Sequence, residues 1–354
     1  MRRMVDKRRW IFAGFNLLLV VLAAVCGILF GRISRQLTSL DAADAWRGSS
    51  EMAFAQIGCF LPVDQTKQET DILQFRQTLE QKLTEESLIA PEGGRLYADA
   101  YSAEARLTVT GDHGSAEVPV IGVGGDFFLF HPLQLRSGSY LSGDDLMQDR
   151  VVLDETLAWT LFGSPDVTGM TVKVGEVPLQ VAGVIRREQD YASRAAYPEN
   201  TGMFLSWSAF SALTEQGITC YEIVLPNLIS GYGLGLVRDN FPVGRGDLVE
   251  NSVRYSLKSL LQVVKDFGRR SMRTNGVIYP YWENAVRMTE DHLALLLVLL
   301  IWLLLCPVVS LTVAVIRAIV RTGNYVQKKI PETADKLVQQ KREERYKRQK
   351  NASP

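Results

Sequence analysis

The sequence predicts a mixed α/β domain held between two membrane-spanning helices. Two long apolar runs, 10–30 and 293–316, lie near the two ends of the chain. The hydrocarbon core of a bilayer is about 30 Å thick and takes about 20 helical residues, so each run is long enough to cross it once. Between the runs, apolar residues recur with both helical and strand periods, which indicates a folded domain that contains helices and strands.

Basic residues flank both apolar runs. They are Arg2, Arg3, Lys7, Arg8 and Arg9 before the first, and Arg317, Arg321, Lys328, Lys329, Lys336, Lys341, Arg342, Arg345, Lys347, Arg348 and Lys350 after the second. Basic residues beside a span are retained on the cytoplasmic side of the membrane. We therefore expect a two-pass protein of the cell membrane, with a cytoplasmic N-terminus (1–9), an extracytoplasmic domain (31–290) and a basic cytoplasmic tail (317–354).

The first apolar run has an alternative interpretation as a cleaved signal peptide, because a basic segment precedes it. The run exceeds the roughly 7 to 15 apolar residues of a typical signal peptide. Val25 before Cys26 does not suit a lipoprotein cleavage site, which needs a small residue at that position. We therefore predict an uncleaved membrane anchor.

The formal net charge of zero conceals an uneven distribution of charge. The flanks hold many of the basic residues and few of the acidic ones, so the segment between the spans carries an acidic excess. A negative field of this kind argues against nucleic acid as a partner of the domain. The basic tail, in contrast, has the charge that attracts anionic lipid headgroups.

The first elements of the domain follow from apolar spacing. The helical spacing from Ile33 to Ala43 predicts that the first span continues outward as a stalk helix, 32–48. A strand is predicted over 52–61, and a helix over 69–83.

The rest of the domain alternates between strand and helix patterns, with turns at glycine-rich positions. Further strands are predicted over 95–101, 105–110, 117–123, 151–153, 171–174, 179–185, 203–207 and 220–225, and further helices over 155–162 and 256–267.

Several motifs in the middle of the chain occur in an informative order. They are Leu135-Arg136-Ser137-Gly138-Ser139-Tyr140-Leu141, Asp149-Arg150-Val151-Val152-Leu153, Leu157-Ala158, Leu161-Phe162-Gly163, Gly169-Met170-Thr171-Val172 and Val181-Ala182-Gly183-Val184-Ile185. This order resembles the MacB-like periplasmic core domain of FtsX-like ABC transporter permeases, with its pattern L-x-x-G-R-x-F, V-V-L, L-A-x-x-L-F-G, G-x-x-I and V-x-G-V. The match is close over 135–185 and loose elsewhere.

The resemblance implies both a fold and a function. The fold is a mixed α/β, α+β type domain of MacB periplasmic-core type between two transmembrane α-helices. The function is that of a permease-like subunit of an ABC-type export or mechanotransmission system, whose outer domain binds or relays. Such permeases usually have four spans, whereas this sequence shows two, and it contains no G-x-x-x-x-G-K-[ST] loop. The implied partners are a separate ABC ATPase subunit and either a second permease chain or another copy of this chain.

A second function class stays open. The chain could be a stand-alone membrane-anchored receptor or scaffold that has the outer fold without transport activity. Recovery of a bound ATPase distinguishes the first class from the second. The tail has a weak apolar stripe from Ile330 onward, which fits coupling to such a subunit as well as it fits a solvated segment on lipid headgroups.

The sequence does not predict an enzyme, a cofactor or a metal site. The histidines are His113 in a predicted turn, His131 before a proline and His292 at the membrane edge, and none belongs to an H-E-x-x-H arrangement. No G-x-S-x-G nucleophile motif occurs either.

Four further residues are candidates for structural roles. Cys59 and Cys220 lie in predicted extracytoplasmic strands, where they either pair as a disulfide or remain two buried free thiols. Pro307 is a candidate hinge in the second span, because proline removes one helical hydrogen bond. Asn16 in the first span either bonds a neighbouring helix or lies near the cytoplasmic edge.

An aromatic cluster precedes the second span. Tyr279, Tyr281 and Trp282 are predicted to form an interfacial belt, because such rings favour the headgroup layer. The alternative is that this segment grips the stalk after the first span and so joins the two membrane helices to the domain.

Overall fold

The computed structural model describes residues 2–88, 90, 94–143, 145, 147–267 and 276–350, with the backbone alone for 2–6, 8–9, 328–329, 331–336 and 342–350. Most of the basic side chains that predict the orientation of the chain, and part of the predicted tail stripe, therefore lie outside the described side chains. The chain forms two compact units, one of Met1–Leu29 with Leu296–Pro354, and one of Phe30–Leu295. The second unit is called the α/β domain below.

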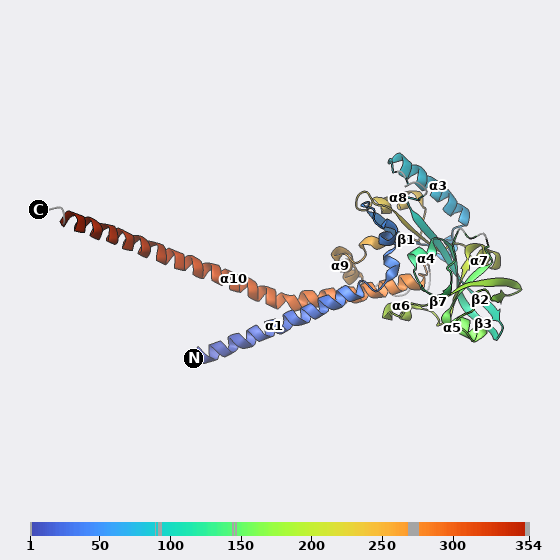
Figure 1. Ribbon diagram of the computed structural model, residues 1–354, viewed down its shortest axis with the longest axis horizontal. Helices are drawn as coiled ribbons and strands as arrows, with labels where there is room; N and C mark the ends of the chain where they lie inside the picture. Colours follow the sequence, from blue (N-terminus) through green and yellow to red (C-terminus); the bar gives the residue numbers. More distant parts are fainter. Residues whose placement is uncertain are drawn as a thin grey trace. The chain divides into compact units, whose positions relative to one another are not determined.

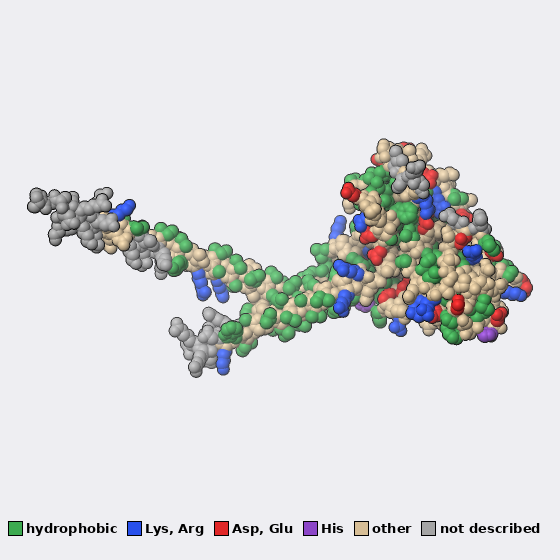
Figure 2. All heavy atoms as spheres, in the orientation of Figure 1, with side chains coloured by type: hydrophobic (Ala, Val, Ile, Leu, Met, Phe, Trp, Pro, Cys, Tyr) green, Lys and Arg blue, Asp and Glu red, His purple; other side chains and the backbone are tan. Residues whose placement is uncertain are grey.

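The first unit is built from two long helices, α1 (Arg2–Ile33) and α10 (Tyr281–Lys350) (Figure 1). Each contains a stretch long and apolar enough to cross a membrane, Trp10–Ile33 and Tyr281–Gln327. Apolar side chains cover both helices over these stretches (Figure 2). Lys, Arg, Glu and Gln predominate after the apolar run of α10, and all four are good helix formers, so the helix continues well past the predicted span.

The α/β domain contains both helices and strands, as the sequence predicts. Its strands are β1 (Phe54–Phe60), β2 (Ala98–Gly111), β3 (Gly114–Gly125), β4 (Gln134–Gly138), β5 (Arg150–Asp154), β6 (Thr171–Val174), β7 (Val177–Arg186), β8 (Met203–Ser206), β9 (Cys220–Pro226) and β10 (Asp247–Glu250). Its helices are α2 (Ala42–Arg47), α3 (Glu69–Glu85), α4 (Phe127–Phe130), α5 (Glu155–Phe162), α6 (Tyr191–Ala196), α7 (Trp207–Leu213), α8 (Tyr232–Asn240) and α9 (Leu257–Asp266), with 3-10 turns η1 (Thr38–Leu40), η2 (Val63–Gln65) and η3 (Asn251–Val253).

Among the described residues, the strands form one ten-stranded sheet, in the order β10-β1-β9-β2-β3-β8-β5-β7-β4. The short strand β6 pairs with both β2 and β7. The pairings β2–β3, β3–β8, β8–β5, β5–β7, β7–β6 and β6–β2 therefore close a ring of strands at one end of the sheet. Closure buries the inner face of these strands from water.

Helices cover the sheet on two sides. Side chains of α3, α5, α7 and α8 belong to one hydrophobic cluster, together with the inward-facing valines of the ring. Side chains of α2, α4, α6 and the first turns of α10 belong to a second cluster on the other side. Because side chains alternate along a strand, neighbouring residues of one strand belong to different clusters.

Two glycines explain part of the motif order noted in the sequence. Gly138 of β4 has φ +75°, and an added Cβ would lie 2.1 Å from the Ala182 carbonyl oxygen. An added Cβ on Gly183 of β7 would lie 2.4 Å from the Ser139 carbonyl oxygen. Both glycines are therefore required where β4 and β7 approach each other, since a side chain at either position would push the strands apart.

The ends of α5 have the capping residues that its sequence predicts. Asp154 is the N-cap, and its carboxylate accepts a hydrogen bond of 2.6 Å from the Leu157 amide. Gly163 ends the helix in the left-handed conformation at φ +69°. The helix connects β5 to β6 and β7, and β5 and β7 are parallel neighbours, which gives a β-α-β unit.

The prediction of a continuous stalk helix over 32–48 is wrong. Helix α1 ends at Ile33, and the chain then turns through η1 into the short α2. Leu37, Ala42 and Ala43 are buried in the second cluster. The segment bends because these apolar side chains are buried against the sheet, where a straight helix could not place them.

Replacement of Gly183 by Ala should destabilise the α/β domain by about 1–3 kcal/mol, because the backbone oxygen of Ser139 must move to admit the methyl group. Gly235→Ala is the matched control, since nothing lies within 4 Å of its added Cβ and α8 should gain about 0.5–1 kcal/mol of helix propensity. Thermal unfolding of the full chain in mild detergent measures both. Equal melting temperatures for the two variants would contradict the close approach of β4 and β7.

Candidate functional site

The first turns of α10 are buried inside the α/β domain. Tyr281, Trp282, Ala285 and Val286 are each exposed by 5% or less. Their spacing places them on one side of the helix, where they join the second hydrophobic cluster. The segment Tyr279 to Glu290, which contains the first turns of α10, is called the junction segment, because the apolar run of the second span begins shortly after it, at Leu293.

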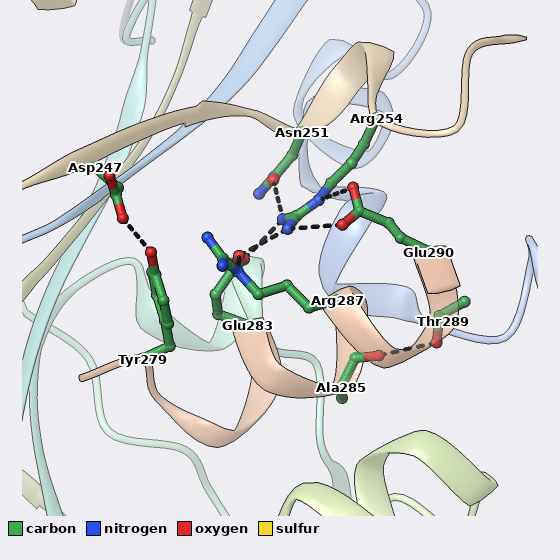
Figure 3. A network of polar contacts seen from close by, with 9 residues as sticks. All are labelled: Asp247, Asn251, Arg254, Tyr279, Glu283, Ala285, Arg287, Thr289 and Glu290. Atoms are coloured by element: carbon green, nitrogen blue, oxygen red, sulfur yellow. Dashed lines mark hydrogen bonds and ion pairs between the residues drawn. The ribbon is translucent and has the colours of Figure 1, made fainter. Parts of the chain in front are cut away.

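A buried ionic network fixes the junction segment to the end of the sheet (Figure 3). Arg254, just after η3, places two of its guanidinium nitrogens 2.7 Å from the two carboxylate oxygens of Glu283. Its Nε donates to Glu290 at 2.7 Å, and a further N–H donates to the Asn251 side-chain oxygen at 3.0 Å. Arg287 also donates to Glu283, at 2.7 Å.

The network keeps its charges although water is almost excluded. Side-chain exposure is 4% for Arg254, 2% for Glu283 and 5% for Glu290. Burial alone would lower the pKa of Arg254, but the charges and hydrogen bonds of the two carboxylates outweigh it and raise that pKa above its ordinary value. Two acids around one arginine leave a negative charge, which Arg287 balances. The group is therefore a paired cluster without excess charge.

Tyr279 extends the same network to the edge strand β10. The Arg287 guanidinium lies 3.7 Å from the centre of the Tyr279 ring, a cation–π contact. The Tyr279 hydroxyl donates to the carboxylate of Asp247 in β10, and its ring packs edge-on against Phe60 of β1. The junction segment is thus joined to two adjacent strands.

The other side of the junction segment packs on a buried histidine. The His131 and Trp282 rings lie 4.3 Å apart, and His131 Nε2 lies 2.6 Å from a carboxylate oxygen of Glu222 in β9. Phe127 of α4 contacts both rings. His131 is a satisfied core residue, so it holds the position of Trp282 rather than offering a reactive group.

The predicted interfacial belt is wrong. Tyr279, Tyr281 and Trp282 are each 4–5% exposed and lie in protein, so they are not available to lipid headgroups. Tyr281 and Trp282 have helical spacing with Ala285 and Val286, so they form one buried face of α10. Tyr279 lies just before the helix and packs against Phe60 of β1. The alternative interpretation, in which this segment holds the chain after the first span, agrees with Leu37, Ala42 and Ala43 in the same hydrophobic cluster.

An open cavity of about 1040 Å³ lies beside the junction segment, lined by polar residues that include Arg187, Glu188 and Tyr197. The Tyr197 ring lies 4.3 Å from that of Tyr281, so the wall of the cavity touches α10. Burial raises the pKa of Glu188, although its bond from the Tyr197 hydroxyl opposes this. Burial also raises the pKa of Asp154 to about 6 despite its ion pair with Arg187. Acids and arginines together make this a candidate site for a polar ligand.

The two spans contact each other through small and apolar side chains. Ala23, Cys26 and Leu303 form a buried cluster between α1 and α10. The Ser310 hydroxyl lies 3.2 Å from the Asn16 side-chain oxygen and 2.7 Å from the Cys306 carbonyl oxygen, so its single proton serves one acceptor at a time. Asn16 is thus within hydrogen-bond distance of the neighbouring helix, which agrees with one of its two predicted roles. Pro307 lies inside the continuous α10, and its role as a hinge stays a prediction.

The candidate disulfide is contradicted by the register of its strands. Cys59 is directly opposite Tyr221, and Cys220 is opposite Phe60. Paired residues share a face of the sheet, so the two thiols point to opposite faces and join different hydrophobic clusters. Both cysteines are free and buried. Burial, with the nearby charge of Glu222, raises the pKa of both thiols, which disfavours the reactive thiolate.

Comparison with known proteins gives a family for this arrangement. A family model described as the MacB-like periplasmic core domain matches residues 18–227. The chain belongs to this family. The match covers the second half of α1, most of the α/β domain and the motif region 135–185, which confirms the resemblance seen in the sequence. The α/β domain is called the MacB-like domain below. The chain therefore contains a MacB-like periplasmic core domain of the ABC transporter permease family, together with two helices long and apolar enough to cross a membrane.

A curated relative supports the same family over a shorter stretch. The macrolide export ATP-binding/permease protein MacB of Chromobacterium violaceum is 35% identical over 101 residues, which cover 27% of this chain and 16% of that protein. The match thus spans less than a fifth of the length of that relative.

The solved structures that match this chain have lower sequence identity to it. The periplasmic region of MacB from Actinobacillus actinomycetemcomitans has 15% identity and a TM-score of 0.42, covering 60% of this chain and 92% of that one. The extracellular domain of the noncanonic ABC-type transporter YknZ from Gram-positive bacteria has 14% identity and a TM-score of 0.36, covering 53% and 92%.

Both cysteines of the MacB-like domain should be alkylated without reductant once the chain is unfolded, because they face opposite sides of the sheet. Intact mass spectrometry after denaturation and alkylation measures the number of adducts, and Cys59→Ser should remove one of them. A peptide that joins Cys59 to Cys220 in a non-reducing digest would contradict the strand register.

Arg254→Ala should destabilise the MacB-like domain by about 3–5 kcal/mol, because it leaves two buried carboxylates without their cation. Arg245→Ala is the matched control: Arg245 pairs with Asp64 at the surface, where side-chain exposures are 69% and 63%, so its loss should cost about 0–1 kcal/mol. Urea unfolding of the full chain in mild detergent, followed by tryptophan fluorescence, measures both. Similar losses for the two variants would show that the network does not hold α10.

Proposed function

We propose that this chain is a permease-like membrane subunit of an ABC-type export or mechanotransmission system, in which the MacB-like domain relays a movement to or from the spans. The observation that carries the proposal is the junction segment. The residues that lead into the second span are held inside the domain by paired buried charges and by aromatic packing. A displacement of α10 therefore acts directly on the sheet.

The buried network suits transmission better than simple anchoring. A flexible linker is enough to keep a domain at a membrane, and such linkers are polar and make few contacts. Here Arg254 bonds two glutamates that lie seven residues apart on α10, so rotation or translation of the helix must break charged hydrogen bonds. Breaking a buried pair costs several kcal/mol, which favours movement of the helix and sheet together.

The cavity next to the junction segment supplies a place where a ligand could influence this coupling. Tyr197 lines the cavity and contacts Tyr281 of α10. A polar ligand that displaces Tyr197 would also change the packing of the junction segment. The proposed domain is thus both a binding and a relay module.

The energy source in this proposal is a separate ABC ATPase subunit, because the sequence contains no P-loop motif. A second permease chain or another copy of this chain would supply further spans. Both termini lie in the cytoplasm, as their basic residues predict, and the tail 317–354 meets the ATPase there. We propose no catalytic or cofactor role for the chain itself, and we propose Pro307 as the point where α10 yields during movement.

Affinity purification of the full chain from mild detergent tests this function. We expect an ATPase of the ABC class among the bound proteins, and we expect its recovery to fall when the tail is removed after Thr322. A variant that carries Arg245→Ala serves as the control, since this surface change should leave recovery unaltered.

Two results distinguish the alternatives. Recovery of the chain alone, under conditions in which a known ABC complex from the same cells stays intact, would favour a stand-alone receptor or scaffold. Full recovery of the ATPase by the truncated chain would keep the transporter function and remove the tail from its coupling surface.

A further inference from the structure

Helix α9 carries apolar side chains that the rest of the MacB-like domain does not cover. Leu260 and Val263 are buried, at 1% and 4% exposure. In contrast, Leu257, Leu261 and Val264 are exposed by 60%, 40% and 37%. They lie at spacings of four and three residues, so they form one continuous row along the helix. This row is called the α9 row.

The charged and polar residues of α9 lie on the sides of the helix that are neither buried nor part of the α9 row. At about 100° per residue, Lys258 and Lys265 lie along the side of the α9 row that faces away from the buried residues. Gln262 and Asp266 follow on the next side and bond each other at 2.7 Å. Around the helix, the buried side is therefore followed by the exposed apolar side, then by a basic side and then by a polar side.

The position of α9 follows from the buried network. The helix begins at Leu257, with Ser256 as its N-cap, three residues after Arg254. Arg254 Nε bonds Glu290 at 2.7 Å, and Glu290 lies one helical turn before the apolar run that starts at Leu293. The chain therefore enters α9 three residues after an arginine that is bonded to α10 just before its apolar run.

We propose that α9 lies in the headgroup layer of the outer leaflet, with the α9 row among the upper acyl chains and Lys258 and Lys265 on lipid phosphates. A helix with an apolar face bordered by lysines, and with its axis in the membrane plane, has the form of an interfacial helix. Lysine side chains at this border extend to the phosphates while their stems cover apolar surface.

The occupant is lipid because lysines border the exposed α9 row, and because α9 follows Arg254, which bonds Glu290 just before the apolar run of α10. Leu293 and Ala294 are buried in protein, and Leu295, at 62% exposure, is the first exposed residue of the apolar run. A bilayer that surrounds α10 from Leu295 onward covers the α9 row in this proposal, so no further partner is needed. The two lysines add attraction to anionic headgroups, worth about 1 kcal/mol each near the surface. This interaction is independent of the proposed transport function.

Site-directed spin labels on the full chain test the proposal. Leu261→Cys places a label in the α9 row, and Gln262→Cys places one on the polar side of the same turn. Cys306→Ala removes a half-buried native thiol, while Cys59 and Cys220 are buried. Each variant is reconstituted in vesicles of phosphatidylethanolamine and phosphatidylglycerol, and collision rates with oxygen and with a water-soluble nickel chelate are measured.

We expect the ratio of oxygen to nickel collisions to be several-fold higher at 261 than at 262. Val264→Cys should give the same high ratio, which guards against a local effect of one substitution. Equal ratios at 261 and 262 would overturn the proposal by showing that the row is in water. Low collision rates with both reagents at 261 would also overturn it, because they would show a protein partner covering the row.

Discussion

The arrangement of this protein depends on the neutralisation of one buried cation. Arg254 lies in the interior, where an isolated charge is very costly, and Glu283 and Glu290 of α10 remove that cost by pairing with it. Neither the arginine nor the two acids could be buried alone. The helix that leads into the membrane and the end of the sheet are therefore stable together, and each depends on the other. The membership of the chain in a family of transporter permeases gives this mutual dependence its functional meaning.

Much of the fold could be predicted from the sequence, because the spacing of apolar residues and the capping residues at helix ends indicate the same elements. Helix α3 has apolar residues at helical spacing, and α5 has both Asp154 at its start and Gly163 at its end. Two predicted strands, 95–101 and 105–110, are one long strand, β2, because nothing between them forms a turn. Helix α8 was missed because Gly233 and Gly235 lower its helix propensity, although Gly233 is needed for close packing against Ala55.

The candidate site was harder to predict, because its residues act through partners far away in the chain. Arg254 lies in a polar stretch with no motif, and its partners are on another element. Tyr281 and Trp282 match the composition of a membrane interface as well as that of a buried helix face, and only the packing decides between them. Cys59 and Cys220 were placed in the correct strands, but a one-residue difference in register determines which face each side chain occupies.

The closed ring of strands also limits how the outer domain can associate. Within the described residues, the pairings leave β4 and β10 as the strands with an unpaired side. Both are short, and both carry charged residues, Arg136 in β4 and Asp247 in β10. Short charged edges resist the addition of a foreign strand. A protein that recognises this domain must therefore bind its side chains and surface shape, because the pairing of a foreign strand with the sheet backbone is disfavoured.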